Sequence, residues 1–214
     1  TPSRLVPPRS RAGSGMAELS PDDVQDFTSG RLSASDPEVA RMLEAALVAA
    51  RRYCGWVVTP VTDDAITLDG PGSRILVLPT RKLVTLTSVT ERGVSLSLAS
   101  LSATPGGPPG ITRPAAIRKT SGGWWGTVYQ SIDIVMTHGY TEAEAADWRY
   151  AVLSMVDEMG QIQLSGTSEL DIVSKKVDDV TYRWADRYAN AAESALYSYS
   201  NVFSSYMLPP VEFL

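Results

Sequence analysis

The chain is poor in the side chains that most enzymes use for proton transfer and metal binding. Its 214 residues contain one cysteine, Cys54, and one histidine, His138. A single cysteine excludes an intrachain disulfide and leaves too few thiols for a cysteine-based zinc site. A single histidine weakens every catalytic mechanism that needs a proton shuttle near neutral pH. The composition therefore predicts a protein that is not an enzyme and holds no cofactor.

Long apolar runs are also missing. No segment approaches the roughly 18 to 20 consecutive apolar residues that a membrane-spanning helix needs. Hydrophobic residues make up 43% of the chain and charged residues 20%, which is ordinary for a globular protein and excludes a fully disordered one. We therefore expect a folded chain with its own core and no membrane partner.

Positive charge is scarce in the part of the chain that should fold. Residues 1–15 contain three arginines and no acid, whereas residues 141–214 have a net charge of −7. Without a basic stripe, we expect no binding to nucleic acid through phosphate neutralisation. Such a protein could still surround DNA without gripping it.

Helix signals dominate the beginning of the chain. Residues 1–15 are mainly proline, glycine, serine and arginine and predict a flexible arm. Ser20 and Asp36 each precede a proline and further acids, a pattern typical of a helix start. Behind Asp36, apolar residues recur at spacings of 3, 4 and 7. The pattern predicts a short helix over about 20–29 and a long one ending near Cys54.

The periodicity changes at Trp56. Short β-branched runs separated by Pro, Gly and Asp predict strands from there to about residue 140. We expect residues 65–97 to form a meander and the proline- and glycine-rich residues 104–114 to form a surface loop. Further strands are predicted over 116–119 and 128–137.

Helical signals return after the strands. Thr141 and Glu144 form a capping box that opens a second long helix. A hairpin is then predicted to turn at Asp178–Asp179, and Asp186 to cap a last helix. The predicted fold class is α+β: a helical body of two long helices plus short N-terminal and C-terminal helices, with an antiparallel β lobe inserted at about 56–140 and a late β-hairpin. Residues 16–198 would form this single domain.

The candidate reactive groups have simpler structural interpretations. His138 lies at a strand-to-helix junction without a local nucleophile or orienting acid. Cys54 lies on the apolar side of a helix end, where a small buried side chain is expected. The carboxylate pairs at 22–23, 63–64 and 178–179 occupy positions where caps and turns favour Asp. We therefore predict no catalytic, cofactor-binding or metal site.

Apolar and aromatic residues concentrate at the C-terminus. The segment contains Tyr199, Val202, Phe203, Tyr206, Met207, Leu208, Pro209, Pro210, Val211 and Phe213. Two prolines in succession prevent a helix from continuing to the end. Residues 199–214 could pack on the chain's own core, or could extend and bind a partner. Trp124 and Trp125, on a predicted turn, favour a subunit interface or packing against a sheet.

Several segments resemble the head–tail connector (adaptor) proteins of tailed phages. The resemblance lies in LDGPG and RILVLP followed by SVTERGVSL within residues 68–96, and in THGY at 137–140 followed by a helix that opens with acids. It continues in SKKVDDVTYRW at 174–184 and in the aromatic, proline-bearing tail. It covers most of residues 36–214. The loop at 104–114, the two tryptophans and residues 1–15 depart from it.

The resemblance implies a structural protein of the virion neck, made in the bacterial cytoplasm and located at the portal vertex. Such adaptors form a ring, usually of twelve copies, that joins head to tail below the portal and extends the DNA channel. The expected partners are the portal protein, other copies of the chain and further neck or tail-completion proteins. Duplex DNA would pass through without specific binding, and residues 199–214 would bind the portal as an extended tail.

Two alternatives remain at this point. The chain could be another neck component, such as a head-closure or tail-terminator protein. An alternative from a different class is a small phage-encoded hydrolase, which would have to use His138 and scattered acids.

Overall fold

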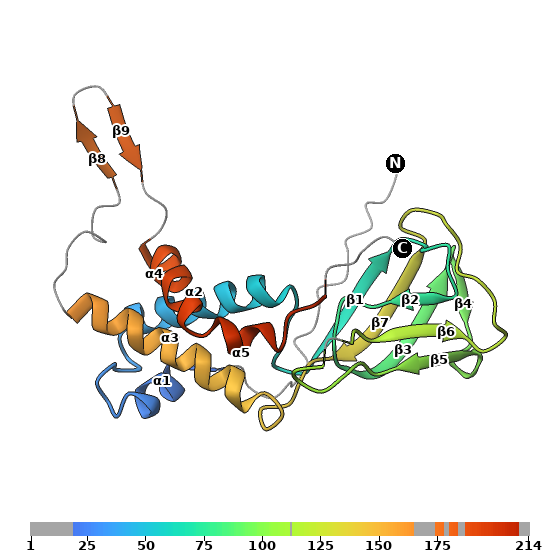
Figure 1. Cartoon of the computed structure of the whole chain (residues 1–214), viewed down its shortest axis with the longest axis horizontal. Helices are drawn as coiled ribbons and strands as arrows, with labels where there is room; N and C mark the ends of the chain where they lie inside the picture. The colour runs from blue at the N-terminus through green and yellow to red at the C-terminus, as the bar shows by residue number, and fades with distance from the viewer. Residues whose placement is uncertain (1–18, 112, 165–173, 178–179, 184–186, 210–214) are drawn as a thin grey trace, which may run out of the picture.

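The computed structural model of the chain describes residues 19–111, 113–164, 174–177, 180–183 and 187–209. Helices gather at one end of the molecule and strands β1 to β7 form a lobe at the other (Figure 1). The helices are α1 (Pro21–Phe27), α2 (Pro37–Cys54), α3 (Ala146–Leu164), α4 (Arg187–Ser198) and α5 (Ser200–Ser204). The strands are β1 (Thr62–Leu68), β2 (Ile75–Val77), β3 (Leu83–Glu91), β4 (Val94–Leu96), β5 (Leu101–Thr104), β6 (Ala116–Lys119), β7 (Ile132–His138), β8 (Ser174–Val177) and β9 (Val180–Arg183), with a 3-10 turn at Leu98–Ser100. The α+β class with a helical body and an inserted β lobe is thereby confirmed.

Helices α1 and α2 begin at their predicted caps, and α2 also ends where predicted. Ser20 and Asp23 form a reciprocal capping box at the start of α1. The Asp36 carboxylate accepts from the Glu38 amide at the start of α2, and Gly55 ends that helix in the left-handed conformation at φ 79°. A residue with a β-carbon would be strained at this φ. Local chemistry alone therefore sets both ends of α2.

The helical body is built around α2. This helix packs against α3 and α4, while α1 lies against α2 and α3, and α5 closes the end of the bundle. The apolar stripe predicted for α2 faces this core, which it shares with buried side chains of α3 and α4. Burial of such a stripe supplies most of the stability of a helix of this kind.

The β lobe consists of two antiparallel sheets around a second core. One sheet has the order β1-β7-β3-β4 and the other β2-β6-β5. Leu76 and Ile117 of the second sheet share a buried cluster with Val89, Ile132 and Ile134 of the first. The strands were expected, but the meander over 65–97 is wrong, because β1 pairs with β7 and β2 pairs with β6.

A glycine turn accounts for this difference. Gly70 and Gly72 follow β1, and their amides donate to the carbonyls of Val128 and Gly126 at 2.9 and 3.0 Å. A β-carbon at Gly70 would lie 2.2 Å from the Gly126 carbonyl oxygen, so this approach requires glycine. After this turn the chain enters the second sheet, so β1 and β2 do not pair with each other.

The late hairpin is present as a separate two-stranded ribbon, with Ser174 opposite Arg183 and Val177 opposite Val180. Its expected turn at Asp178–Asp179, the cap at Asp186 and the arm at 1–15 lie outside the described residues. Among the helices that the structure describes, none combines the length and apolar character needed to span a bilayer.

Candidate assembly surfaces

The first half of the C-terminal segment belongs to the chain's own core, contrary to the expectation of an extended tail over 199–214. Residues 200–204 form α5. Phe203 and Tyr206, two of the expected portal anchors, have an exposed fraction of 0%. Tyr199 and Val202 are half-buried against the same helical core. The reason is that the end of α2 leaves apolar surface that these side chains cover.

Hydrogen bonds to backbone carbonyls also hold the same segment at the end of α2. The Trp56 indole donates to the Tyr206 carbonyl at 2.7 Å. The Leu208 amide donates to the Cys54 carbonyl at 2.9 Å, and Leu208 packs beside the helical core. Met207 is exposed and Pro209 is half-buried, while Pro210, Val211 and Phe213 lie outside the described residues. Among the described residues that follow Tyr206, Met207 alone is exposed.

A buried arginine joins the β lobe to the helical body. Arg81 lies just before β3 and is fully buried. Its guanidinium donates to the carbonyls of Ser205 and Met207 in the C-terminal segment and to those of Pro108 and Ile111 in the proline-rich loop. The loop and the segment are also bonded directly, from the Gly110 amide to the Ser205 carbonyl at 3.0 Å. A surface loop over 104–114 was expected; the structure ties it to the C-terminal segment.

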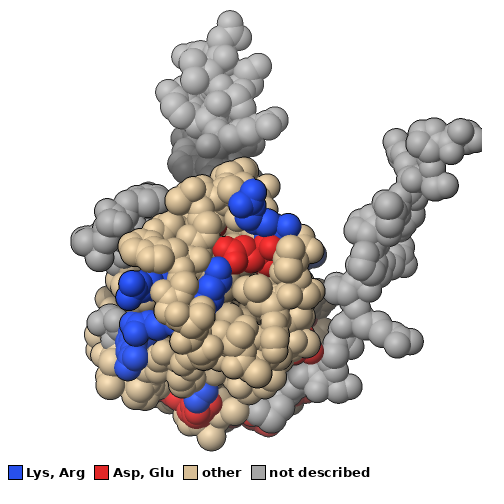
Figure 2. Space-filling model, turned by 90° about the vertical axis from the view of Figure 1, so that its right-hand side faces the viewer, with Lys and Arg blue, Asp and Glu red and all other residues tan. Residues whose placement is uncertain are grey.

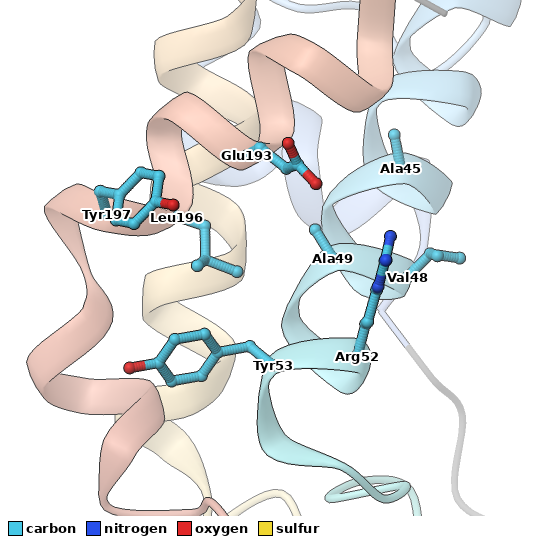
Figure 3. A pocket seen from close by; sticks show the side chains of 8 residues that line it. All are labelled: Ala45, Val48, Ala49, Arg52, Tyr53, Glu193, Leu196 and Tyr197. Atoms are coloured by element: carbon cyan, nitrogen blue, oxygen red, sulfur yellow. The ribbon is translucent and has the colours of Figure 1, made fainter. Parts of the chain in front are cut away.

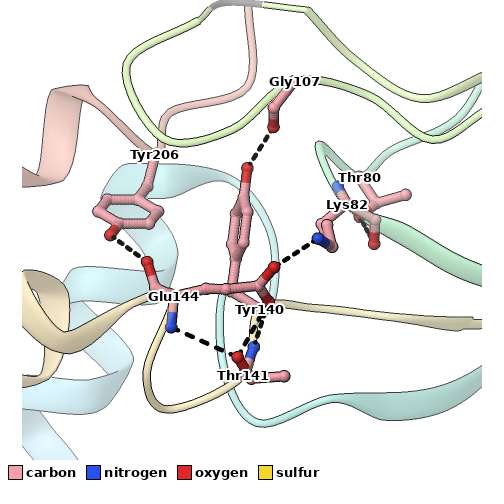
Figure 4. A network of polar contacts seen from close by, with 7 residues as sticks. All are labelled: Thr80, Lys82, Gly107, Tyr140, Thr141, Glu144 and Tyr206. Atoms are coloured by element: carbon pink, nitrogen blue, oxygen red, sulfur yellow. Dashed lines mark hydrogen bonds and ion pairs between the residues drawn. The ribbon is translucent and has the colours of Figure 1, made fainter.

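Aromatic side chains fill the rest of this junction (Figure 4). The Tyr140 hydroxyl donates to the Gly107 carbonyl at 2.7 Å. The Tyr140 and Tyr206 rings meet edge to face with centroids 5.6 Å apart, a favourable geometry for aromatic pairs. The Tyr206 hydroxyl donates to the Asp147 carboxylate. Burial raises the pKa of both tyrosines, so both hydroxyls stay protonated and act as donors.

A partly exposed ion pair also joins the β lobe to the residues just before α3. Lys82 contacts Glu144 at 2.6 Å, and Glu144 also accepts from Thr141 in the predicted capping box. The Lys82 hydrogen bond and the Thr141 amide hold the pKa of Glu144 below its ordinary value. The capping box opens a turn at residues 142–145, and α3 starts only at Ala146, later than the box predicted.

The two tryptophans have different environments. Trp125 is buried in the lobe core with an exposed fraction of 1%, whereas Trp124 is 61% exposed. Trp125 therefore cannot form a subunit interface, and the expectation of an interface role is wrong for this residue. Trp124 carries Arg74 over its ring at 5.7 Å, and its interface role remains a prediction.

The end of the β lobe that lies away from the helices carries charges of both signs. Figure 2 looks onto it and shows Lys and Arg side chains in separate groups, with Asp and Glu beside some of them, on a largely uncharged surface. Residues 56–140 contain seven Lys and Arg but five Asp and Glu. The acidic excess of the chain therefore lies outside the lobe.

A groove runs between α2 and α4 (Figure 3). It has a volume of about 390 Å³ and is lined by Ala45, Val48, Ala49, Arg52, Tyr53, Glu193, Leu196 and Tyr197. Val48 and Tyr197 are strongly exposed at 56% and 76%. No sequence pattern indicates this groove, because it arises only when the two helices are packed together.

The two candidate reactive side chains, Cys54 and His138, are both buried. Cys54 is fully buried, and burial raises its pKa to about 12, so the thiol is unreactive at neutral pH. His138 is buried beside the Trp56 ring, with centroids 6.1 Å apart, and its nearest acid is Asp64 at 3.7 Å. Within the described residues no cluster of three or more His, Cys, Asp and Glu could hold a metal.

His138 should make folding sensitive to mild acid. Burial lowers the pKa of the imidazole below its ordinary 6.5, and the Asp64 carboxylate opposes this only partly. As the pH falls below 6.5, the unfolded chain takes up the proton first, so stability present at pH 7 is lost. We expect the free energy of unfolding of the wild type to fall more steeply between pH 7 and about pH 5 than that of His138→Leu. Urea titrations across this range measure it, and parallel curves would contradict it.

The chain resembles known proteins at the level of the fold. No protein-family model and no curated protein matches the chain. The fold is similar to that of a chain in the neck of an empty gene transfer agent (GTA) particle computed with C6 symmetry, with a TM-score of 0.53 and 15% identity over 91% of each chain. A chain in the neck of the native GTA particle computed with C12 symmetry gives a TM-score of 0.50 and 11% identity over 93% of this chain and 96% of that one. At these identities the likeness establishes a common fold.

Proposed function

We propose that the chain is a structural protein of the neck of a phage-like particle, where copies form a ring that joins head to tail and extends the DNA channel. The observation that carries the proposal is the fold shared, over nine-tenths of both chains, with chains in the necks of GTA particles. Those necks were computed with C6 and C12 symmetry, and a ring of about twelve copies is proposed here by analogy. The virion is the corresponding location.

The chemistry of the described residues supports a structural role. The sole cysteine and the sole histidine are both buried, and each serves packing in the geometry above. The two lobes are fastened together by Arg81, Tyr140 and Tyr206, as expected for a part that must transmit load between two assemblies.

The portal is the proposed partner of the end of the chain. The segment from Met207 onward follows Tyr206, the last fully buried side chain among the described residues, and its sequence MLPPVEFL is apolar with two prolines. Prolines limit the conformations of the free segment and so lower the ordering cost of binding. Repetition around a ring would multiply a modest single contact.

The proposal is tested by negative-stain imaging of the purified protein, alone and with portal assemblies. The expected result is a ring joined coaxially to the portal. A ring that joins only tail tubes would instead assign a tail-terminator role, and the absence of any ring with either partner would contradict a neck function.

A protein that lines a DNA channel should not bind the DNA that passes through it. The chain has a formal net charge of −5, so we expect no detectable binding to duplex DNA at micromolar protein and physiological salt. Fluorescence anisotropy of a labelled duplex measures this, with and without portal-bound rings. Tight binding that weakens steeply with salt would contradict a passive channel and would implicate the basic groups of the lobe.

A further inference from the structure

We propose that neighbouring copies associate head to tail, with the Phe27–Tyr150 side of one helical body inserted into the α2–α4 groove of the next copy. The inference rests on the proposed ring and names the surfaces that would form it. A heterologous contact of this kind uses two different surfaces and generates closed rings when its rotation closes.

The groove presents apolar surface that the described residues of the same chain leave open. Val48 and Tyr197 stand at its rim, and Ala49, Tyr53 and Leu196 line it. Val48 projects outward from α2, although Leu47 before it and Ala50 shortly after it are buried. An exposed apolar cluster in a concave site is typical of a protein interface.

The inserted side chain would be Tyr150. It projects from α3 and is 61% exposed. Its ring stands edge to face on Phe27 of α1, with centroids 5.4 Å apart and an interplanar angle of 75°. A tyrosine supported in this way is already held in place, so its burial costs little conformational entropy. Large aromatic side chains dominate the energetics of protein interfaces.

The charged residues that α2 places beside the groove and α1 places beside Phe27 are opposite in sign. Arg41, Val48 and Arg52 lie along one stripe of α2, seven and four residues apart, so two exposed guanidinium groups flank the apolar centre. On the other surface, Asp22 and Asp26 are exposed on α1, close to Phe27. Within the described part of the chain these four groups form no ion pair, and head-to-tail packing would pair them.

The positions of the helices fit a head-to-tail contact. Helix α1 packs against α2 and α3, whereas α4 packs against α2, α3 and α5. Figure 1 shows α1 and α4 on opposite sides of the α2–α3 pair.

The experiment uses two substitutions that each disable one surface. Val48→Glu places a carboxylate in the groove, and Tyr150→Glu removes the inserted ring and adds a charge. Val94→Glu, at an exposed position of β4, is the matched control. Circular dichroism and melting temperature confirm folding, and sedimentation velocity and native mass spectrometry measure association in solution and on portal assemblies.

We expect the dissociation constant for self-association to rise at least tenfold in Val48→Glu and in Tyr150→Glu, and to stay unchanged in Val94→Glu. An equimolar mixture of the two disabled variants should form a one-to-one heterodimer and nothing larger, because one intact surface remains on each. A charge exchange, Arg52→Glu with Asp26→Arg, should restore association that either change alone weakens.

Each contrary result has a distinct meaning. Rings that form equally well in both disabled variants would overturn this contact and leave the neck function standing. Loss of portal binding in Val48→Glu with intact rings would assign the groove to another partner and would also overturn the contact. A wild-type chain that stays monomeric at millimolar concentration and on the portal would overturn both the ring and the contact.

Discussion

Replacing Arg81 with methionine is expected to lower the free energy of unfolding by about 2–4 kcal/mol, because each buried carbonyl that loses its donor costs about 1–3 kcal/mol. The guanidinium is fully buried and donates to carbonyls of two segments far apart in sequence. Methionine can occupy much of the same space but donates nothing, so the carbonyls of Ser205 and Ile111 lose a donor in a buried site. The loss should separate the lobe from the body before either unfolds.

Chemical denaturation of Arg81→Met followed by tryptophan fluorescence measures the effect. Hydrogen exchange should become faster in residues 106–111 and 205–208, while the lobe core stays protected. The matched control is Arg118→Met on β6, an exposed position, where a change within about 0.5 kcal/mol is expected. A loss below about 1 kcal/mol for Arg81→Met would mean that the junction is held by its aromatic contacts instead.

Two truncations should separate the structural and binding parts of the C-terminus. Deletion of 199–214 should abolish stable folding, because it removes Phe203 and Tyr206, both fully buried. Truncation of a buried aromatic side chain costs about 3–5 kcal/mol, and a domain has only about 5–15 kcal/mol in total. Deletion of 210–214 should leave the melting temperature unchanged and abolish co-sedimentation with the portal.

The shorter deletion is the decisive one. Because it leaves every described contact of α5 intact, lost portal binding could not be attributed to unfolding. Retained portal binding by this variant would show that the partner surface lies elsewhere on the chain. A stable, soluble variant lacking 199–214 would contradict the placement of Phe203 and Tyr206 in the helical core.

The sequence pattern does not predict which of the two adjacent tryptophans is buried. Trp124 and Trp125 are adjacent in a turn without periodicity, so the sequence offers no sign of which one points inward. The lobe core covers Trp125, and Lys119 lies 4.7 Å above its ring, while Trp124 is left outside. Side chains at successive positions of extended backbone point to opposite sides, but only the sheets decide which side is the core.

Local chemistry was enough to predict several features from the amino-acid order alone: the caps at Ser20 and Asp36, the end of the long helix near Cys54, the capping box at Thr141 and the β-branched strands. Each depends on residues within a few positions of one another, where sterics and hydrogen bonding act without the rest of the fold. The order of these helix and strand signals also predicted the α+β architecture.

Features that depend on distant segments were decided only by the tertiary structure. The pairing of β1 with β7, the burial of Phe203 and Tyr206, and the bond from Arg81 to the Ser205 carbonyl each join residues more than fifty positions apart. An apolar residue in sequence shows only that it needs a partner surface; whether that surface belongs to its own core or to another chain depends on which segments pack nearby. The apolar C-terminus contains both outcomes, since its first half completes the helical core and its last residues remain the proposed contact with the portal.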